Sequence, residues 1–201
     1  MYQTQNYING KYSDFNNKDN LDIYNPSTGE IIGSVVNSDQ TELEKTIEIS
    51  KKAQLDWANF TPLKRSRIIS KYKDLIEKNI NNLAKIVSTE HGKTIDDAIG
   101  SITRGLEVVE FACGIPHLLK GEFSLNVGTN IDSWSFRQPL GICAGITPFN
   151  FPAMVPMWMY PISIACGNSF ILKPSEKDPS CPVKLAELFS EAGLPEGVFN
   201  V

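Results

Sequence analysis

The chain has 201 residues, 41% of them hydrophobic and 21% charged, which is typical of a globular protein with its own core. Its net charge of −4 argues against a general nucleic-acid-binding surface. No run of about 18 apolar residues occurs, and the first residues lack the basic start and apolar core of a signal peptide. We therefore expect neither a membrane span nor secretion.

Four cysteines and two histidines are the first candidates for metal binding or redox chemistry. No CxxC pair occurs, which argues against a zinc site, and a disulfide framework is not expected at this size and cysteine density. Cys143 and Cys166 fall in an apolar strand and an apolar helix, where a buried, inert thiol is common. We expect no metal, no catalytic cysteine among the four, and a reducing cytoplasm.

The first 36 residues are rich in turn formers and predict β hairpins. Asn9-Gly10 and the segment 25–29 separate short β segments such as 22–24 and 31–36. A helix follows, capped by Ser38 or Asp39. Its apolar residues at helical spacing are Leu43, Ile47, Ala53 and Trp57.

A second helix begins at Pro62 and carries a regular apolar stripe as far as Val87. Near its start lies a short basic cluster, which we interpret as a solvated face. This cluster consists of Lys64, Arg65 and Arg67. The asparagines in 79–82 indicate a break that would divide the stripe between two helices.

A third helix is capped by Thr94 and carries two stripes, one apolar and one of small residues, which predicts packing on two sides. Arg104 borders the small-residue stripe, three residues from Ser101. A buried arginine needs an anionic partner. The sequence leaves open whether that partner is a protein carboxylate or a substrate carboxylate.

Residues 138–176 predict a βαβ unit. An apolar strand at 142–146 runs into a proline-rich turn, a buried helix follows, and a second strand ends at Lys173. Helices alternating with strands predict a parallel sheet, and open α/β sheets bind ligands at the carboxyl ends of their strands. A further helix starts near residue 180. A last strand begins at 198–201 without room to finish, so we expect an unpaired sheet edge there.

Asn150 is the first candidate catalytic residue, because Pro148 and Pro152 fix the backbone of its turn directly after the first strand. An amide held in this way is suited to donate a hydrogen bond to an oxygen that gains negative charge. The alternative is a turn asparagine that bonds its own backbone.

Lys173 and Glu176 end the second strand of the same unit. A lysine and a carboxylate together bind sugar hydroxyls, one donating and the other accepting, and the neighbouring Lys177 is placed to flank an adenine or a phosphate. The alternative is an exposed loop with ordinary surface charges. Neither GxGxxG after the first strand nor GxxxxGK[ST] is present, so both standard phosphate-loop motifs are absent.

The whole stretch resembles the aldehyde dehydrogenase superfamily, and within it the CoA-acylating methylmalonate-semialdehyde dehydrogenases. The residues that carry the resemblance are PLGICAGITPFNFPAMVPMWMYPISIACGNSFILKPSE, supported by NPSTGE near the start and FACGIP before the ribbon. The resemblance implies an α/β fold: an incomplete Rossmann-type NAD-binding domain with N-terminal β hairpins, a helical segment and part of a β oligomerisation arm. The implied boundaries are 1–120 for the hairpins and helices, 121–137 for the arm and 138–201 for the truncated sheet.

The resemblance also implies a role for each matching residue. Asn150 would be the oxyanion donor, Arg104 would bind the substrate carboxylate, and NAD and coenzyme A would be cofactor and co-substrate. NAD would be held by Thr147, Phe149, Lys173, Glu176 and Lys177, although this branch often has arginine at the last position. The substrate would be a small semialdehyde, and the full-length protein a homo-oligomer, specifically a homotetramer.

Family members are more than twice as long as this chain, and their nucleophilic cysteine and catalytic domain would lie beyond Val201. We therefore expect the 201-residue chain to be the amino-terminal part of such an enzyme and inactive alone. Two alternatives stay open. One is another aldehyde dehydrogenase, such as a succinate-semialdehyde dehydrogenase, and the other is a non-catalytic remnant that binds a nucleotide or a partner.

Overall fold

A computed structural model describes residues 1–13 and 19–201. Its centre is a parallel sheet in the order β10-β9-β8. These strands are β8 (Ile142–Ile146), β9 (Ser169–Lys173) and β10 (Phe199–Asn200). Helices α5 (Met154–Ala165) and α6 (Ser180–Glu191) connect them, so the predicted βαβ unit and its continuation are confirmed.

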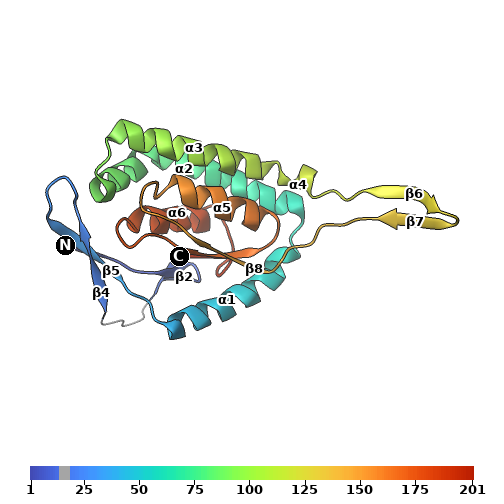
Figure 1. The fold of residues 1–201 in the computed structure, drawn as a ribbon, viewed down its shortest axis with the longest axis horizontal. Helices are drawn as coiled ribbons and strands as arrows, with labels where there is room; N and C mark the ends of the chain where they lie inside the picture. The colour runs from blue at the N-terminus through green and yellow to red at the C-terminus, as the bar shows by residue number, and fades with distance from the viewer. Residues whose placement is uncertain (14–18) are drawn as a thin grey trace.

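Helices form layers on both faces of this sheet (Figure 1). α1 (Gln40–Ala58) covers one face and contacts all three strands. α5 and α6 lie on the other face, and α2 (Pro62–His91) and α3 (Ile95–Cys113) pack outside them. A single short turn of helix, α4 (Ile115–Leu118), follows α3. Within the described residues, no helix is long and apolar enough to span a bilayer.

The amino-terminal segment contains the predicted hairpins and one pairing that was not predicted. β2 (Tyr7–Ile8) pairs antiparallel with β3 (Lys11–Tyr12), and β4 (Asn20–Tyr24) pairs antiparallel with β5 (Ile31–Val36). β1 (Tyr2–Thr4), however, runs parallel to β5. Parallel strands that are far apart in sequence are not joined by a tight turn, so no turn motif in the sequence predicts that they pair.

The predicted unpaired edge at residues 198–201 is wrong, because the amino-terminal hairpin covers it. Tyr7 and Val201 exchange both backbone hydrogen bonds, at 2.8 and 2.9 Å, which is the pattern of a hydrogen-bonded antiparallel pair. The amide of Asn9 also donates to Asn200 Oδ1 at 2.9 Å. Val198 and Asn200 are fully buried as a result.

The predicted starts of α1 and α3 are confirmed by their capping bonds. The side chains of Asp39 and Thr94 accept from the third residue of α1 and α3 respectively, and Gly92 ends α2 in the left-handed conformation. The predicted break at 79–82 is wrong, because α2 is continuous. The side chain of Asn79 donates to the carbonyl of Leu75, four residues earlier, and thus fits inside the helix.

The inward face of α1 is largely polar, contrary to the apolar spacing read from the sequence. Leu43 and Ile47 are exposed, and of the four apolar residues only Trp57 is fully buried. The buried polar side chains are bonded: Asn200 Nδ2 donates to Ser50 Oγ at 2.9 Å, and Gln54 Nε2 donates to the Gly167 carbonyl at 3.2 Å. These specific bonds to the sheet side of the molecule orient the helix.

The basic cluster on α2 is also not a uniformly solvated face. Lys64 and Arg67 are exposed, but Arg65 is buried. Its guanidinium donates to the carbonyls of Phe60 and Ala165, at 2.5 and 3.0 Å. Burial lowers the pKa of Arg65. Arg65 therefore ties the end of α5 to the turn between α1 and α2.

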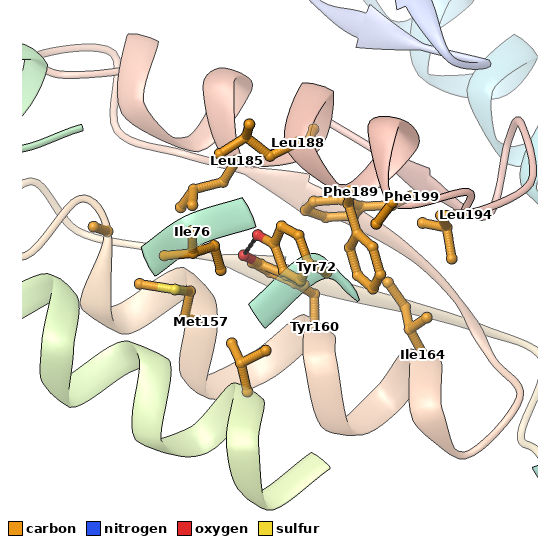
Figure 2. Close-up of a cluster of buried hydrophobic side chains, with 14 of the residues drawn as sticks. Tyr72, Ile76, Met157, Tyr160, Ile164, Leu185, Leu188, Phe189, Leu194 and Phe199 are labelled. Atoms are coloured by element: carbon orange, nitrogen blue, oxygen red, sulfur yellow. Dashed lines mark hydrogen bonds between the residues drawn. The ribbon is translucent and has the colours of Figure 1, made fainter. Parts of the chain in front are cut away.

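The core between α2, α5, α6 and β10 combines aromatic rings with aliphatic side chains (Figure 2). Tyr72 stacks on Phe189 with centroids 4.0 Å apart, and Tyr160 stacks on Phe199 at 4.3 Å. The two tyrosine hydroxyls bond each other at 2.5 Å, so neither is left unsatisfied. Burial raises the pKa of both tyrosines. This core anchors the helix that follows the Asn150 turn.

The predicted ribbon at 121–137 is confirmed as an antiparallel pair, β6 (Phe123–Gly128) with β7 (Ile131–Trp134). It projects from the body of the molecule (Figure 1). Its strand residues are exposed apart from Gly128, which is half-buried. The large apolar side chains left in solvent on and beside it are Phe123, Leu125, Val127, Ile131, Trp134 and Phe136.

Candidate functional site

The candidate site lies where β8 and β9 end side by side. The Thr147 amide donates to the Lys173 carbonyl at 3.1 Å, which joins the two strand ends. The parallel register, with Ile146 opposite Lys173, brings the turn after β8 next to the loop after β9. The two polar segments singled out in the sequence therefore meet at one edge, as expected for an open α/β sheet.

Asn150 lies exposed in the turn between β8 and α5. Its carboxamide makes no hydrogen bond to any residue that the structure describes. The alternative interpretation, a turn asparagine that bonds its own backbone, is therefore not what the structure contains. A carboxamide on a proline-flanked turn, with its donors free, is arranged to bind a ligand oxygen.

Lys173 and Glu176 form an ion pair with Nζ and Oε2 3.2 Å apart. The pKa of Glu176 is lowered, first by a hydrogen bond from its own backbone amide and second by the hydrogen bond from Lys173. The side chains are 59% and 48% exposed, so the pair adds little to stability. Both line a cavity of about 430 Å³ that also contacts the end of β5, the start of α1 and the end of β10.

Phe149 and Lys177 contact each other across the same edge. The Lys177 ammonium lies 4.5 Å from the centre of the half-exposed Phe149 ring, a cation–π distance. Thr147 behind them is buried, and its hydroxyl has no partner among the described residues. The five residues proposed to hold a cofactor thus lie together: Thr147 is bonded to Lys173, Lys173 pairs with Glu176, and Phe149 contacts Lys177.

Arg104 is exposed on α3, which corrects the expectation that it lies buried. It makes no ion pair with a carboxylate in the described part of the chain, so a protein carboxylate is not its partner there. Its Nε lies 3.4 Å from Met154 Sδ, and its guanidinium carbon lies 5.9 Å from the Phe151 ring centre. The guanidinium is therefore beside the Asn150 turn and available to an external anion.

Sequence reasoning missed two buried carboxyl groups near this edge. Glu90 accepts from Tyr2 Oη at 2.6 Å and from the Ser180 amide at 3.1 Å. Asp178 is buried with one oxygen unpartnered, and burial, with the nearby Glu90 carboxylate second, raises its pKa to about 7. Acidic residues on a helix end and a loop are usually solvated, and only the tertiary structure brings β1 and the start of α6 against Glu90.

Only Cys181 is buried; Cys113, Cys143 and Cys166 are half-buried, which corrects the expectation of buried thiols at Cys143 and Cys166. Burial raises the pKa of Cys113, Cys166 and Cys181, which disfavours the reactive thiolate. All four cysteines are free. In the described ranges, no group of three or more His, Cys, Asp or Glu residues is placed to hold a metal ion.

The model of the aldehyde dehydrogenase family matches residues 12–201. The chain belongs to the aldehyde dehydrogenase family. It is 55% identical to malonate-semialdehyde dehydrogenase from Pseudomonas aeruginosa, over 96% of this chain and 39% of that protein. It is 47% identical to the mitochondrial acylating methylmalonate-semialdehyde dehydrogenase from Arabidopsis thaliana, over 98% of this chain and 32% of that protein.

Solved aldehyde dehydrogenase structures agree with this fold. A methylmalonate-semialdehyde dehydrogenase from Oceanimonas doudoroffii superposes with a TM-score of 0.97 at 48% identity, covering 100% of this chain and 41% of that one. A structure from Sinorhizobium meliloti, described as a complex with NAD, gives a TM-score of 0.98 at 53% identity, covering 100% of this chain and 41% of that one. The chain thus spans about two fifths of these structures.

Proposed function

We propose that this chain supplies the first NAD-binding strands and the oxyanion donor of a CoA-acylating malonate/methylmalonate-semialdehyde dehydrogenase. The observation that carries the proposal is the free Asn150 carboxamide at the end of β8, beside the unpaired guanidinium of Arg104. An aldehyde that also bears a carboxylate offers its carbonyl oxygen to the carboxamide and its carboxylate to the guanidinium. The high identity to malonate- and methylmalonate-semialdehyde dehydrogenases supports this substrate class.

The residues at the sheet edge fit NAD. The Lys173–Glu176 pair offers a donor and an acceptor for ribose hydroxyls, and the Phe149 ring with Lys177 offers an apolar face and a cation. The buried Thr147 hydroxyl has a hydrogen-bonding capacity that no described residue uses. When bound, NAD supplies the hydride acceptor for oxidation of the aldehyde carbon.

Asn150 would act on the oxygen of the substrate. In the proposed reaction a cysteine thiolate from outside residues 1–201 adds to the aldehyde carbon, and negative charge develops on the carbonyl oxygen. The Asn150 Nδ2–H group donates to that oxygen and lowers the barrier. Oxidation leaves a cysteine thioester, and the thiol of coenzyme A takes the acyl group and releases the cysteine.

The exposed apolar side chains of β6 and β7 favour assembly of the full-length protein into a homo-oligomer through this ribbon. The four free cysteines agree with a reducing cytoplasm as its location.

The test is a product assay with full-length protein that contains this chain. Malonate or methylmalonate semialdehyde, NAD and coenzyme A should yield NADH and an acyl-CoA. Faster turnover of succinate semialdehyde, or NADH formation independent of coenzyme A, would favour another aldehyde dehydrogenase. Absence of turnover with any aldehyde, but retained nucleotide binding, would favour a non-catalytic remnant. The 201-residue chain alone should give no NADH, because the nucleophile of the proposed reaction is a cysteine outside residues 1–201.

A further inference from the structure

Lys93 occupies a fixed position between two helices, next to the candidate site. It follows Gly92, which ends α2 at a φ of 85°, and precedes Thr94, which caps α3. Its side chain is only 7% exposed. A buried ammonium ion is costly unless it is paired and hydrogen-bonded. The groups around this ammonium therefore indicate what it does.

The Lys93 ammonium contacts both sides of the site. On its own side it lies 3.4 Å from Asp97 Oδ2, in the first turn of α3. Across the site it lies 3.5 Å from the backbone carbonyl of Asn150, 57 residues away in sequence, and 4.4 Å from the centre of the Phe151 ring. It thus connects the rigid α2–α3 turn to the two residues at the tip of the turn after β8.

This contact reaches the backbone of Asn150 and leaves its carboxamide free. His91 lies beside the same turn: burial and then the Lys93 ammonium lower its pKa, while the Asn150 backbone acts in the opposite direction. The imidazole is therefore held neutral, and Lys93 supplies the positive charge at this carbonyl. A catalytic donor must be held in place before charge develops on the substrate.

We propose that Lys93 is a positioning residue, whose ammonium holds the Asn150 backbone so that the Asn150 carboxamide faces the aldehyde oxygen. This role rests on the proposed function of Asn150 as oxyanion donor. The contact itself is independent of that function and can be measured separately.

The chain offers a matched control. Lys73 on α2 also pairs with an acid four residues later, Glu77, at 2.9 Å, and its side chain is 23% exposed. Its ion-pair partners, Asp74 and Glu77, both lie on α2 itself and not in the Asn150 turn. Lys93→Met and Lys73→Met each remove one such i,i+4 pair and keep an unbranched side chain. Lys93→Arg keeps the charge and serves as the rescue variant.

The experiment uses a full-length protein in which this chain is continued by the remaining part of the Pseudomonas aeruginosa relative. Hydrogen–deuterium exchange across residues 147–153 should be faster in Lys93→Met and unchanged in Lys73→Met. The kcat of Lys93→Met should fall by about tenfold or more, since small displacements of catalytic groups have effects of this size. The dissociation constant for NAD should stay the same in Lys93→Met. In Lys93→Arg, the exchange rate at 147–153 and the kcat should both return most of the way to those of the unsubstituted protein.

Unchanged exchange at 147–153 in Lys93→Met would overturn the proposal, as would faster exchange spread evenly over the chain. Equal effects of Lys93→Met and Lys73→Met would also overturn it. If the unsubstituted fusion is inactive, the proposed function fails, but the exchange measurement still decides whether Lys93 holds the turn. Local loosening with unchanged kcat would mean that Lys93 holds the turn without serving catalysis, and would overturn the positioning role.

Discussion

The turn after β8 and the β6–β7 ribbon both expose aromatic side chains, but in different surroundings. In the turn, Phe149 lies beside the Lys177 ammonium, and the adjacent Phe151 lies beside that of Lys93. The ribbon exposes large apolar side chains that alternate with polar ones, and no cation–π contact to them occurs in the described part of the chain. Aromatic rings beside a few placed polar groups are typical of a site for a small ligand, while exposed apolar side chains on a ribbon are typical of a surface that binds another protein chain.

The largest expected difference between the two regions is in stability: a substitution in the aromatic core should lower the free energy of unfolding far more than one in the ribbon. Phe189→Ala removes a ring stacked between α2 and α6, and should lower the free energy of unfolding by about 3–5 kcal/mol. Phe123→Ala, at an exposed ribbon position, should change it by less than about 0.5 kcal/mol. Urea titrations followed by circular dichroism measure both. Similar losses for the two variants would contradict the assignment of the ribbon as an independent surface.

Asn150→Ala in full-length enzyme should lower kcat by about a hundredfold or more, because one oxyanion donor is lost. The dissociation constant for NAD should not change, since the cofactor residues lie on other positions of the edge. Asn81→Ala, at an exposed position of α2, is the matched control and should have full activity. Normal turnover of Asn150→Ala would refute the donor role.

Asp178 should make the stability of the sheet region depend on pH. Its pKa is raised from 3.8 to about 7 in the folded state, so folding favours the protonated form. This contribution to stability is complete below pH ~4 and is lost as the pH rises through about 7. Asp178→Asn should therefore raise the free energy of unfolding at pH 8 by about 1–3 kcal/mol. It should have little effect near pH 4.

Thermal and urea unfolding at both pH values would show this difference. Asp56→Asn, at an exposed position of α1, is the control and should not alter the pH profile. A gain in stability that is the same at pH 4 and pH 8 would mean that the titration of Asp178 is not its cause.

The ribbon should affect assembly and not folding. Trp134→Ser removes a large exposed ring from β7 and should shift the full-length protein toward smaller species in sedimentation velocity. Its unfolding midpoint, measured at a concentration where the variant is monomeric, should match that of the unsubstituted monomer. Trp158→Ser, at an exposed position on α5, is the control ring and should leave the assembly unchanged.

The sequence by itself determined the local elements and the place of the site. Turn residues, capping residues and apolar periodicity predicted the β4–β5 hairpin, the starts of the three long helices and the βαβ unit. These features are encoded within a few residues of one another. Parallel strand order then placed Thr147 to Asn150 next to Lys173, because carboxyl ends of parallel strands share one edge.

The tertiary structure alone decided which side chains are buried and which strands pair over long distances. Arg65 is buried and donates to carbonyls at the end of α5 and in the turn between α1 and α2, whereas Arg104 is exposed although it lies on an amphipathic helix. Tyr7 pairs with Val201, and Lys93 reaches Asn150, across long separations in sequence. Such contacts depend on how complete elements pack, and no local pattern of residue types specifies them.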